Sequence, residues 1–278
     1  MKRLFDEVSF KISKTVTEKY STSFSLGILA LNPSLRPAIY AIYGYVRLAD
    51  EIVDSFHDYN KPLLLARLVS ETWAAIDEGI SLNPVLQSFQ QTVNRFNIDK
   101  SLISQFLHSM EMDLEEIDYD GQLYQEYILG SAEVVGLMCL QVFVEGDTNL
   151  FNRLKPQAMK LGAAFQKVNF LRDLRDDFQL LGRSYFPDIQ MTQFSDQVKN
   201  DIEKDIQRDF DQALEGIRRL PTSSRFGVYL AYKYYLSLFR KIKQSSAKRI
   251  MEKRIRIPNS HKISLAMSSY FHYKISIA

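Results

Sequence analysis

Apolar residues recur along this chain at intervals of three and four, the spacing that places them on one face of an α-helix. The clearest run covers residues 99–118, where the apolar positions are Leu102, Ile103, Phe106, Leu107, Met110, Leu114 and Ile117. Strict alternation, the pattern of a strand, is scarce, and its best instance is the short stretch RIRI at 254–257. The pattern therefore predicts an all-α protein.

Prolines and capping residues indicate where several helices begin and end. Pro62 and Pro84 each lie near an expected helix start, and Asn83 is placed to cap the second. Further helices are expected at 34–56, 156–181, 196–218 and 222–250, the last two separated at Pro221. No internal repeat, low-complexity tract or linker interrupts the chain. We expect residues 1–278 to form a single helical domain of about eight to ten helices.

One predicted helix carries acids inside an apolar stretch, RLADEIVDSF at residues 47–56. Residues three or four apart share a helix face, so Tyr43, Arg47, Asp50 and Asp54 form one polar stripe. Glu51 lies to one side of this stripe. Spaced acids on a helix usually mark only a solvated face, so this stripe alone is weak evidence of a site.

A second stripe occurs in LGAAFQKVNFLRDLRDDFQLLGRSYFP, residues 161–187. Gln166, Asn169, Asp173 and Asp177 follow one another at steps of three, four and four. Gly162 is small at one end of the stripe. Arg172 and Asp176 fall on an adjacent face, where they are expected to pair with other charges. Two acidic stripes, each embedded in apolar sequence, favour a site over a solvated face.

Buried carboxylates must be neutralised by cations, because an unpaired buried charge is very costly. Oxygen ligands from two facing helices suit Mg²⁺, which keeps waters and bridges to substrate phosphates. Only four histidines are present and none form H-x-x-x-H, which disfavours a transition-metal site. The residues thus predict a helical cavity in which Mg²⁺ binds a diphosphate, with Arg47 clamping phosphate oxygens.

Loss of diphosphate leaves a carbocation, which needs a dry pocket with aromatic faces and few nucleophiles. For any single aromatic residue, ordinary core packing is the more common role. The candidate walls are Phe24, Tyr40, Tyr43, Phe165, Phe170, Tyr232 and Tyr235.

Composition narrows the protein class further. Apolar residues make up 46% of the chain, enough for a large core, and the net charge of +2 gives no reason to expect nucleic acid. The one cysteine, Cys139, excludes an intrachain disulfide and lies in an apolar run. The first residues lack an apolar signal core, and the longest uncharged apolar run, 134–144, is about half a membrane span. We expect a cytoplasmic protein, at most peripheral at the inner membrane face.

These motifs resemble the squalene/phytoene synthases, the head-to-head prenyl transferases. The resemblance covers YSTSFSLGILALNPSLRPAIYAIYGYVRLADEIVDSF (20–56), EYILGSAEVVGLMCL (126–140) and 161–187, and continues weakly through 234–257. It implies the isoprenoid synthase fold, a helical bundle with a central cavity. It also implies joining of two prenyl diphosphates through a cyclopropylcarbinyl diphosphate.

The resemblance assigns roles to individual residues. The metal-binding set is Asp50, Asp54, Asn169, Asp173 and Asp177. The residues implied at the reacting groups are Tyr43, Arg47 and Tyr235. The substrate-binding set is Ser21, Ser23, Phe24, Tyr127, Gln166, Arg183 and Arg254. Arg183 and Tyr185 fall in GRSYFP, which resembles the family's flap.

Two positions depart from the family pattern. Glu51 stands where the first motif often has a second aspartate, an exchange we expect to be tolerated. Tyr127 keeps the first tyrosine of a Y-C-Y sequence, but Leu129 lacks the second hydroxyl. That departure weakens any role for a tyrosine at position 129 in proton transfer or in ordering diphosphate.

The best-matching activity is a phytoene synthase that joins two geranylgeranyl diphosphates with Mg²⁺, or Mn²⁺ in its place. The alternatives are a dehydrosqualene or squalene synthase using two farnesyl diphosphates, with NADPH needed only for squalene. A non-catalytic assembly protein of the same fold is the alternative from another class. Eight Lys and Arg residues within 240–256 usually mark a solvated face, although they also suit contact with anionic lipid. The sequence leaves the oligomeric state and the substrate chain length open.

Overall fold

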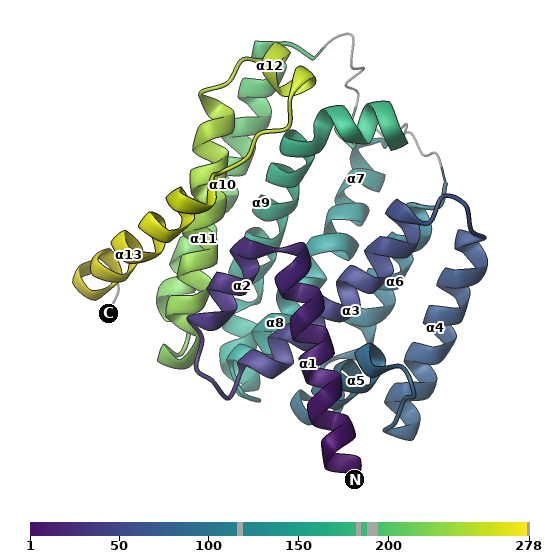
Figure 1. The fold of residues 1–278 in the computed structure, drawn as a ribbon. Coiled ribbons are helices and arrows are strands. Elements are labelled where there is room, and N and C mark those ends of the chain that lie inside the picture. Colours follow the sequence, from purple (N-terminus) through teal and green to yellow (C-terminus); the bar gives the residue numbers. More distant parts are fainter. Residues whose placement is uncertain (116–118, 182–184, 188–193, 277–278) are drawn as a thin grey trace.

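The computed structural model describes residues 1–115, 119–181, 185–187 and 194–276. Within these residues every regular element is helical, so the all-α prediction is confirmed (Figure 1). The elements are α1 Lys2–Tyr20, α2 Thr22–Leu29, α3 Arg36–Ser55, α4 Lys61–Glu78, α5 Pro84–Phe96, α6 Lys100–Met112, α7 Gly121–Ile128, the π-helical turn η1 Leu129–Glu133, α8 Val134–Phe143, α9 Thr148–Leu181, α10 Asp196–Arg219, α11 Thr222–Lys243, α12 Ala247–Glu252 and α13 Asn259–Ser276.

Capping side chains set several of the predicted helix starts. Asn83 Oδ1 accepts a hydrogen bond from the Val85 backbone N–H at 3.0 Å, as its position before Pro84 predicts. Asn60 caps α4 in the same way, and Ser195 caps α10. The predicted helix at 34–56 is confirmed as α3, and that at 196–218 as α10.

Other boundaries differ from the prediction. The described residues contain thirteen α-helices rather than eight to ten, because α1, α12 and α13 carry weak apolar patterns. The helix expected at 156–181 begins at Thr148 and keeps Pro156 inside it. Pro156 and Asn152 are both exposed, so water satisfies the carbonyl that the proline leaves unbonded. The run expected at 222–250 ends at Lys243, and the RIRI stretch joins α12 to α13 without forming a strand.

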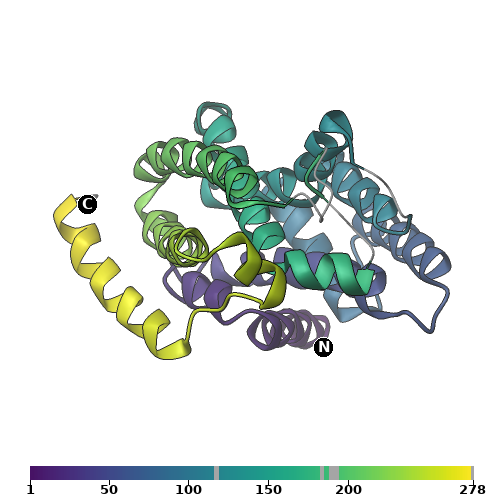
Figure 2. The same ribbon diagram turned by 90° about the horizontal axis from the view of Figure 1, so that it is seen from above.

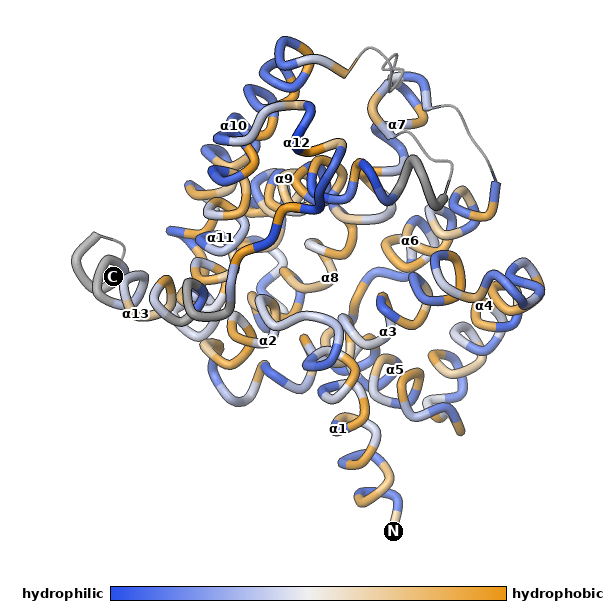
Figure 3. Tube along the Cα trace, turned by 45° about the horizontal axis from the view of Figure 1, so that its top comes forward, coloured by the Kyte–Doolittle hydropathy of each residue, from blue (hydrophilic) through white to orange (hydrophobic). Residues whose placement is uncertain are grey.

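The helices form a ring around one apolar interior. Helix α9 packs against α8 and α10, α2 packs against α11, and α1 packs against α3 and α5. Seen from above, α13 lies outside this ring beside α11 (Figure 2). Apolar residues concentrate on the inward faces of the helices (Figure 3). The acid-bearing ends of α3 and α9 can therefore meet at one end of a shared interior.

The continuous helical stretch α7–η1–α8 forms one wall of that interior. Tyr127, Ser131, Val135, Cys139 and Phe143 all line it, at steps of four residues. An α-helix turns about 100° per residue, so sixteen residues would rotate the last position by about 160° from the first. The π-helical turn contains one extra residue and removes about 100° of that rotation. It thereby keeps the whole stripe facing the interior.

The same stretch, Gly121–Phe143, is long and apolar enough to cross a membrane by length and composition alone. Half of its most apolar 18-residue stretch is buried inside the protein. Its small residues allow close packing, since a Cβ at Gly130 would lie 2.6 Å from the Gln105 carbonyl oxygen. These contacts are typical of a core helix.

Candidate functional site

A cavity of about 580 Å³ occupies the centre of the helical ring. It is lined by α2, α3, α8, α9, α10 and α11, with contributions from α6, α7 and the segment after α12. Residues from both acidic stripes line it together, so the structure joins motifs that lie far apart in the sequence. The predicted site residues in its lining are Ser21, Phe24, Tyr43, Arg47, Asp50, Asp54, Tyr127, Gln166, Asn169, Asp173, Tyr235 and Arg254.

On α3, Arg47 is held by acids one turn further along the helix. Its guanidinium forms a short ion pair with Glu51 and lies 3.8 Å from Asp50 Oδ2. It also stacks over the Tyr20 ring, 4.4 Å from the centroid. Arg47 Nε is buried and has no hydrogen-bond partner among the described residues. A buried donor without a partner is unfavourable for stability.

Asp50 lies in an environment that disfavours its charge. Burial, followed by the charge of Asp54, raises the pKa of Asp50 to about 7, although Arg47 opposes the shift. About a third of the side chain remains exposed, but it faces the cavity rather than open water. Arg47, at 3.8 Å, thus offsets only part of the unfavourable charge at Asp50, and a divalent cation bound there would stabilise the ionised carboxylate.

On α9, Asp173 is already compensated. Arg254 Nε donates to Asp173 Oδ1 at 2.6 Å, and Arg172 Nε donates to the same oxygen at 2.9 Å. Arg172 also forms a short bond to Asp173 Oδ2. The neighbouring Asn169 Oδ1 accepts a hydrogen bond from the Tyr235 hydroxyl at 3.3 Å. The two acidic helices therefore differ, since arginines pair directly with Asp173 but only distantly with Asp50.

A buried ion-pair cluster holds α9 against α10 on the side away from the cavity. Lys167 Nζ donates to Asp209 Oδ2 at 2.7 Å and to Asp205 through a shorter contact. Lys160 lies 3.0 Å from Asp209 Oδ1. Lys167 is two residues from Asn169, so this cluster fixes the position of the second stripe. Removing one partner of such a buried pair is strongly destabilising.

Aromatic rings form the wall between the two acidic helices. Phe165 and Tyr235 stack with centroids 3.8 Å apart, and Phe24 contacts Tyr43 at 5.3 Å. Phe170 completes the aromatic lining. Tyr40 and Tyr232, also proposed as walls, are not in the lining and belong to the core, because their positions on α3 and α11 face neighbouring helices. Burial raises the pKa of Tyr43 and of Tyr235, so both phenols stay protonated at neutral pH.

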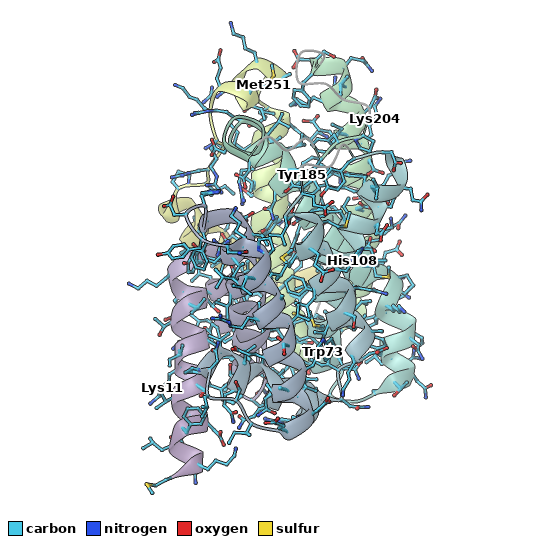
Figure 4. The ribbon with its side chains drawn as sticks, turned by 90° about the vertical axis from the view of Figure 1, so that its right-hand side faces the viewer. Lys11, Trp73, His108, Tyr185, Lys204 and Met251 are labelled. Atoms are coloured by element: carbon cyan, nitrogen blue, oxygen red, sulfur yellow. The ribbon has the colours of Figure 1, made fainter. Side chains whose placement is uncertain are left out.

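Tyr127 is part of a buried group that the sequence did not reveal. Its hydroxyl donates to Asp113 Oδ2 at 2.7 Å, and the Tyr185 hydroxyl donates to Asp113 Oδ1 at 3.2 Å. All three residues line the cavity. Tyr185 lies toward the end of the bundle that carries Met251 and away from Lys11 (Figure 4). Asp113 follows the last turn of α6, and no spacing in the sequence sets it apart from other acids.

Three predicted residues are not placed in the cavity. Ser23 is half-buried on α2 but does not line it, because its helix turns Phe24 inward instead. The Asp177 side chain and all of Arg183 lie outside the described residues. Ser21 does line the cavity, and its Oγ also caps α2 by accepting from the Phe24 N–H at 3.2 Å.

Away from the acids, the lining of the cavity is mostly apolar. Its lining along α9 extends from Asp173 to Leu154, a distance of about 28 Å at 1.5 Å per residue. Small residues such as Ala158, Ala213 and Gly216 line the far part. The thiol of Cys139 also lies here, and burial raises its pKa to about 12, so it stays protonated.

The residues fit a divalent cation of the hard, oxygen-binding class. The acids and amides of the two stripes offer carboxylate and amide oxygens, and the charge of Asp54 raises the pKa of the neighbouring Asp50. Within the described part of the chain, no three acidic, histidine or cysteine side chains converge to form a complete metal cage. A cation that keeps waters and substrate phosphates as ligands does not require one.

Known proteins resemble this chain in fold and in sequence. A dehydrosqualene synthase of known structure, crystallised with a ligand, superposes with a TM-score of 0.81 over 97% of this chain and 98% of its own, at 21% identity. Phytoene synthase 1 of Solanum lycopersicum is 28% identical over 82% of this chain, which spans 58% of that protein's length. The 15-cis-phytoene synthase of Synechocystis is 28% identical over 92% of this chain and 83% of its own length.

The sequence profile of the squalene/phytoene synthase family matches residues 17–261. The chain therefore belongs to the squalene/phytoene synthase family, as its motifs predicted. The family depends in general on divalent metal ions, which agrees with the oxygen-rich donor set described above. The matching structure confirms the isoprenoid synthase fold.

Proposed function

We propose that this protein joins two prenyl diphosphates head to head, and that two geranylgeranyl diphosphates, giving phytoene, are its principal substrates. The observation that carries the proposal is one cavity with acids and arginines at one end and an apolar lining along the rest. The polar end suits two diphosphates and the apolar remainder suits their hydrocarbon tails. The family membership and the phytoene synthase relatives support the same reaction.

The length of the cavity favours the longer substrate. An extended carbon chain advances about 1.2 Å per bond, so each isoprene unit adds about 5 Å. Three units span about 14 Å and four about 19 Å, whereas the lining along α9 extends about 28 Å from Asp173. Ala158 lies about 22 Å from Asp173 along α9, so a tail of four units ends much closer to it than a tail of three.

The proposed metal ion is Mg²⁺, held by Asp50, Asp54, Asn169, Asp173 and Asp177. It would neutralise the diphosphates and assist their departure. Arg47 lines the cavity beside Asp50, and its guanidinium binds a diphosphate oxygen. Tyr43 and Tyr235 remain protonated, so neither acts as a base. Tyr43 donates a hydrogen bond to the leaving group, whereas the Tyr235 hydroxyl donates to Asn169.

The reaction then proceeds within the apolar cavity. The C1–O bond of one substrate breaks and releases diphosphate, and the C2–C3 double bond of the other substrate attacks the allylic cation. Loss of a proton closes a cyclopropylcarbinyl diphosphate. Its own diphosphate then leaves, and rearrangement with loss of a second proton gives the conjugated triene. The faces of Phe24 and Phe165 stabilise the cations, and the dry lining excludes water.

Product analysis tests the proposal directly. Purified protein is incubated with Mg²⁺ and either farnesyl or geranylgeranyl diphosphate, with and without NADPH, and the hydrocarbons are identified by mass. A C40 triene formed without NADPH is the expected result. C30 dehydrosqualene, or squalene that requires NADPH, would assign the chain to a sister activity. No diphosphate release from either substrate would favour the assembly-protein alternative.

Variants connect the product to the site. Asp173→Asn should lower turnover by about a thousandfold or more, since electrostatic groups at reacting centres contribute on that scale. Asp58→Asn is the matched control, because Asp58 is exposed just beyond α3 and is not part of the lining. Near-normal turnover in Asp173→Asn would remove the proposed metal site while leaving the fold assignment intact.

We also propose that the protein binds peripherally to anionic lipid at the cytoplasmic face of the membrane. The basic residues at 240–256 are all exposed and belong to the same segment that delivers Arg254 to the cavity. A hydrocarbon product would then leave close to a bilayer. Sedimentation with vesicles containing phosphatidylserine, compared with neutral vesicles, tests this contact, and equal binding to both would contradict it.

A further inference from the structure

Asp173 is the predicted metal ligand whose two oxygens are already occupied. Oδ1 accepts from Arg254 Nε at 2.6 Å and from Arg172 Nε at 2.9 Å, and Oδ2 accepts from Arg172. Side-chain exposure is 18% for Asp173 and 39% for Arg254. A divalent cation that binds Asp173 must therefore displace at least one guanidinium group.

Arg254 can leave without a change in the fold. It belongs to the segment of residues 253–258, which joins α12 to α13 outside any helix. This segment is fixed by the buried Ile255 and by Lys241 Nζ, which donates to the Arg256 carbonyl at 2.6 Å. Arg175 Nη1 donates to the Glu252 carbonyl just before it. The backbone is held while the exposed Arg254 side chain keeps room to rotate.

We propose that Arg254 is an exchangeable counter-ion, which occupies Asp173 in the empty enzyme and moves onto the diphosphate when metal and substrate bind together. The proposal rests on the proposed function, because it concerns the same metal and diphosphate site. In the empty site Arg254 neutralises the carboxylate that the metal needs. When a diphosphate is present, the displaced guanidinium gains phosphate oxygens in place of Asp173, so its displacement is far less unfavourable.

The exchange couples metal binding to diphosphate binding. Metal alone must separate Arg254 from Asp173 and leave the guanidinium without a partner of opposite charge. Diphosphate alone competes with Asp173 for the same guanidinium. Each ligand therefore raises the affinity of the site for the other by an equal factor, as linkage requires. The protein would hold little metal until a substrate arrives.

The test measures Mn²⁺ binding by electron paramagnetic resonance of the free ion, with and without inorganic diphosphate. In wild type, diphosphate should raise the Mn²⁺ affinity by about fivefold to a hundredfold. Arg254→Gln should bind Mn²⁺ alone at least about fivefold more tightly than wild type, and diphosphate should then add less. Arg254→Lys keeps the charge and should stay close to wild type.

Arg256→Gln is the matched control. Arg256 is exposed on the same segment but is not part of the cavity lining, so its loss removes the same charge without removing a guanidinium from Asp173. If Arg256→Gln tightens Mn²⁺ binding as much as Arg254→Gln, the effect is general electrostatics and the exchange is wrong. An unchanged or weaker affinity in Arg254→Gln overturns it as well.

The two proposals fail differently. If the wild-type protein turns over prenyl diphosphates but Arg254→Gln has the same Mn²⁺ affinity as wild type, the proposed function stands and the exchange is wrong. If the protein binds no Mn²⁺ even with diphosphate present, and releases no diphosphate from either substrate, the proposed function itself is wrong.

Discussion

At Asp50, the requirements of stability and of metal binding oppose each other. Burial and the nearby Asp54 raise its pKa from 3.8 to about 7, so the empty site works against ionisation. Between pH of about 4 and 7 the folded protein binds a proton that the unfolded chain does not. The free energy of unfolding of the metal-free protein therefore falls as pH rises through this window.

Replacing this carboxyl should remove the penalty. Asp50→Asn is expected to raise the melting temperature of metal-free protein at pH 8, by about 2–4 °C for each kcal/mol recovered. Thermal unfolding from pH 4 to pH 8 in a chelator measures the effect, which should vanish at the acidic end. Asp58→Asn should follow the wild-type curve. A less stable Asp50→Asn at pH 8 would contradict the repulsion inferred at this site.

Asp113 is the residue-scale feature that only the structure revealed. It accepts hydrogen bonds from Tyr127 and Tyr185, and an asparagine offers one fewer acceptor oxygen. Asp113→Asn should lower the free energy of unfolding by about 1–3 kcal/mol, because a buried hydroxyl loses its partner. It should also slow turnover at least about tenfold, since both tyrosines line the cavity.

Urea unfolding and steady-state kinetics of Asp113→Asn, Tyr127→Phe and the double variant measure this coupling. Tyr127→Phe removes the donor, so the double variant should lose less stability than the sum of the single variants. Strict additivity would show that the hydrogen bond contributes nothing.

At the scale of elements, the close approach of α9 to η1 depends on Gly162. A Cβ there would lie 2.6 Å from the Ala132 carbonyl oxygen, a backbone atom that cannot rotate away. Gly162→Ala should therefore lower the free energy of unfolding by about 1–3 kcal/mol, despite the better helix propensity of alanine. Chemical denaturation of Gly162→Ala checks this value.

Gly121 provides the control for that substitution. It also lies in a helix, but a Cβ there meets nothing within 4 Å. Gly121→Ala should be neutral or slightly stabilising. If both alanine variants behave alike, the packing of α9 on η1 is looser than described.

Sequence patterns predict some features of these elements and miss others. The cap at Asn83 and the two acidic stripes follow from local spacing, so they were predictable. The extension of α9 to Thr148 was missed because proline usually starts or ends a helix, and only an exposed surface lets Pro156 stay inside. Asp113 was missed because its partners, Tyr127 and Tyr185, meet it only through tertiary packing.

At the scale of the whole molecule, we expect the depth of the cavity to determine which substrate length the protein prefers. Ala158→Phe should fill the far part and lower kcat/KM for geranylgeranyl diphosphate at least tenfold, a loss typical of a clash in an apolar pocket, while farnesyl diphosphate is affected less. Competition between the two substrates in one reaction measures the ratio. Ala66→Phe, at an exposed position on α4, is the matched control.

Two outcomes would contradict this expectation. Equal loss for both substrates would place the tails elsewhere in the cavity. An unchanged ratio would mean that neither tail reaches the depth of Ala158.

The π-helical turn η1 has a consequence for insertions and deletions along the chain. Its extra residue keeps Tyr127 and Phe143 on one face, although they belong to helices of different rotational phase. Deleting a single residue between 129 and 133 would restore regular helix and turn one side by about 100° relative to the other. Either the Tyr127 hydroxyl would then lose its hydrogen bond to Asp113, or Val135, Cys139 and Phe143 of α8 would no longer line the cavity. Insertions and deletions within residues 129–133 should therefore be tolerated far less well than substitutions there.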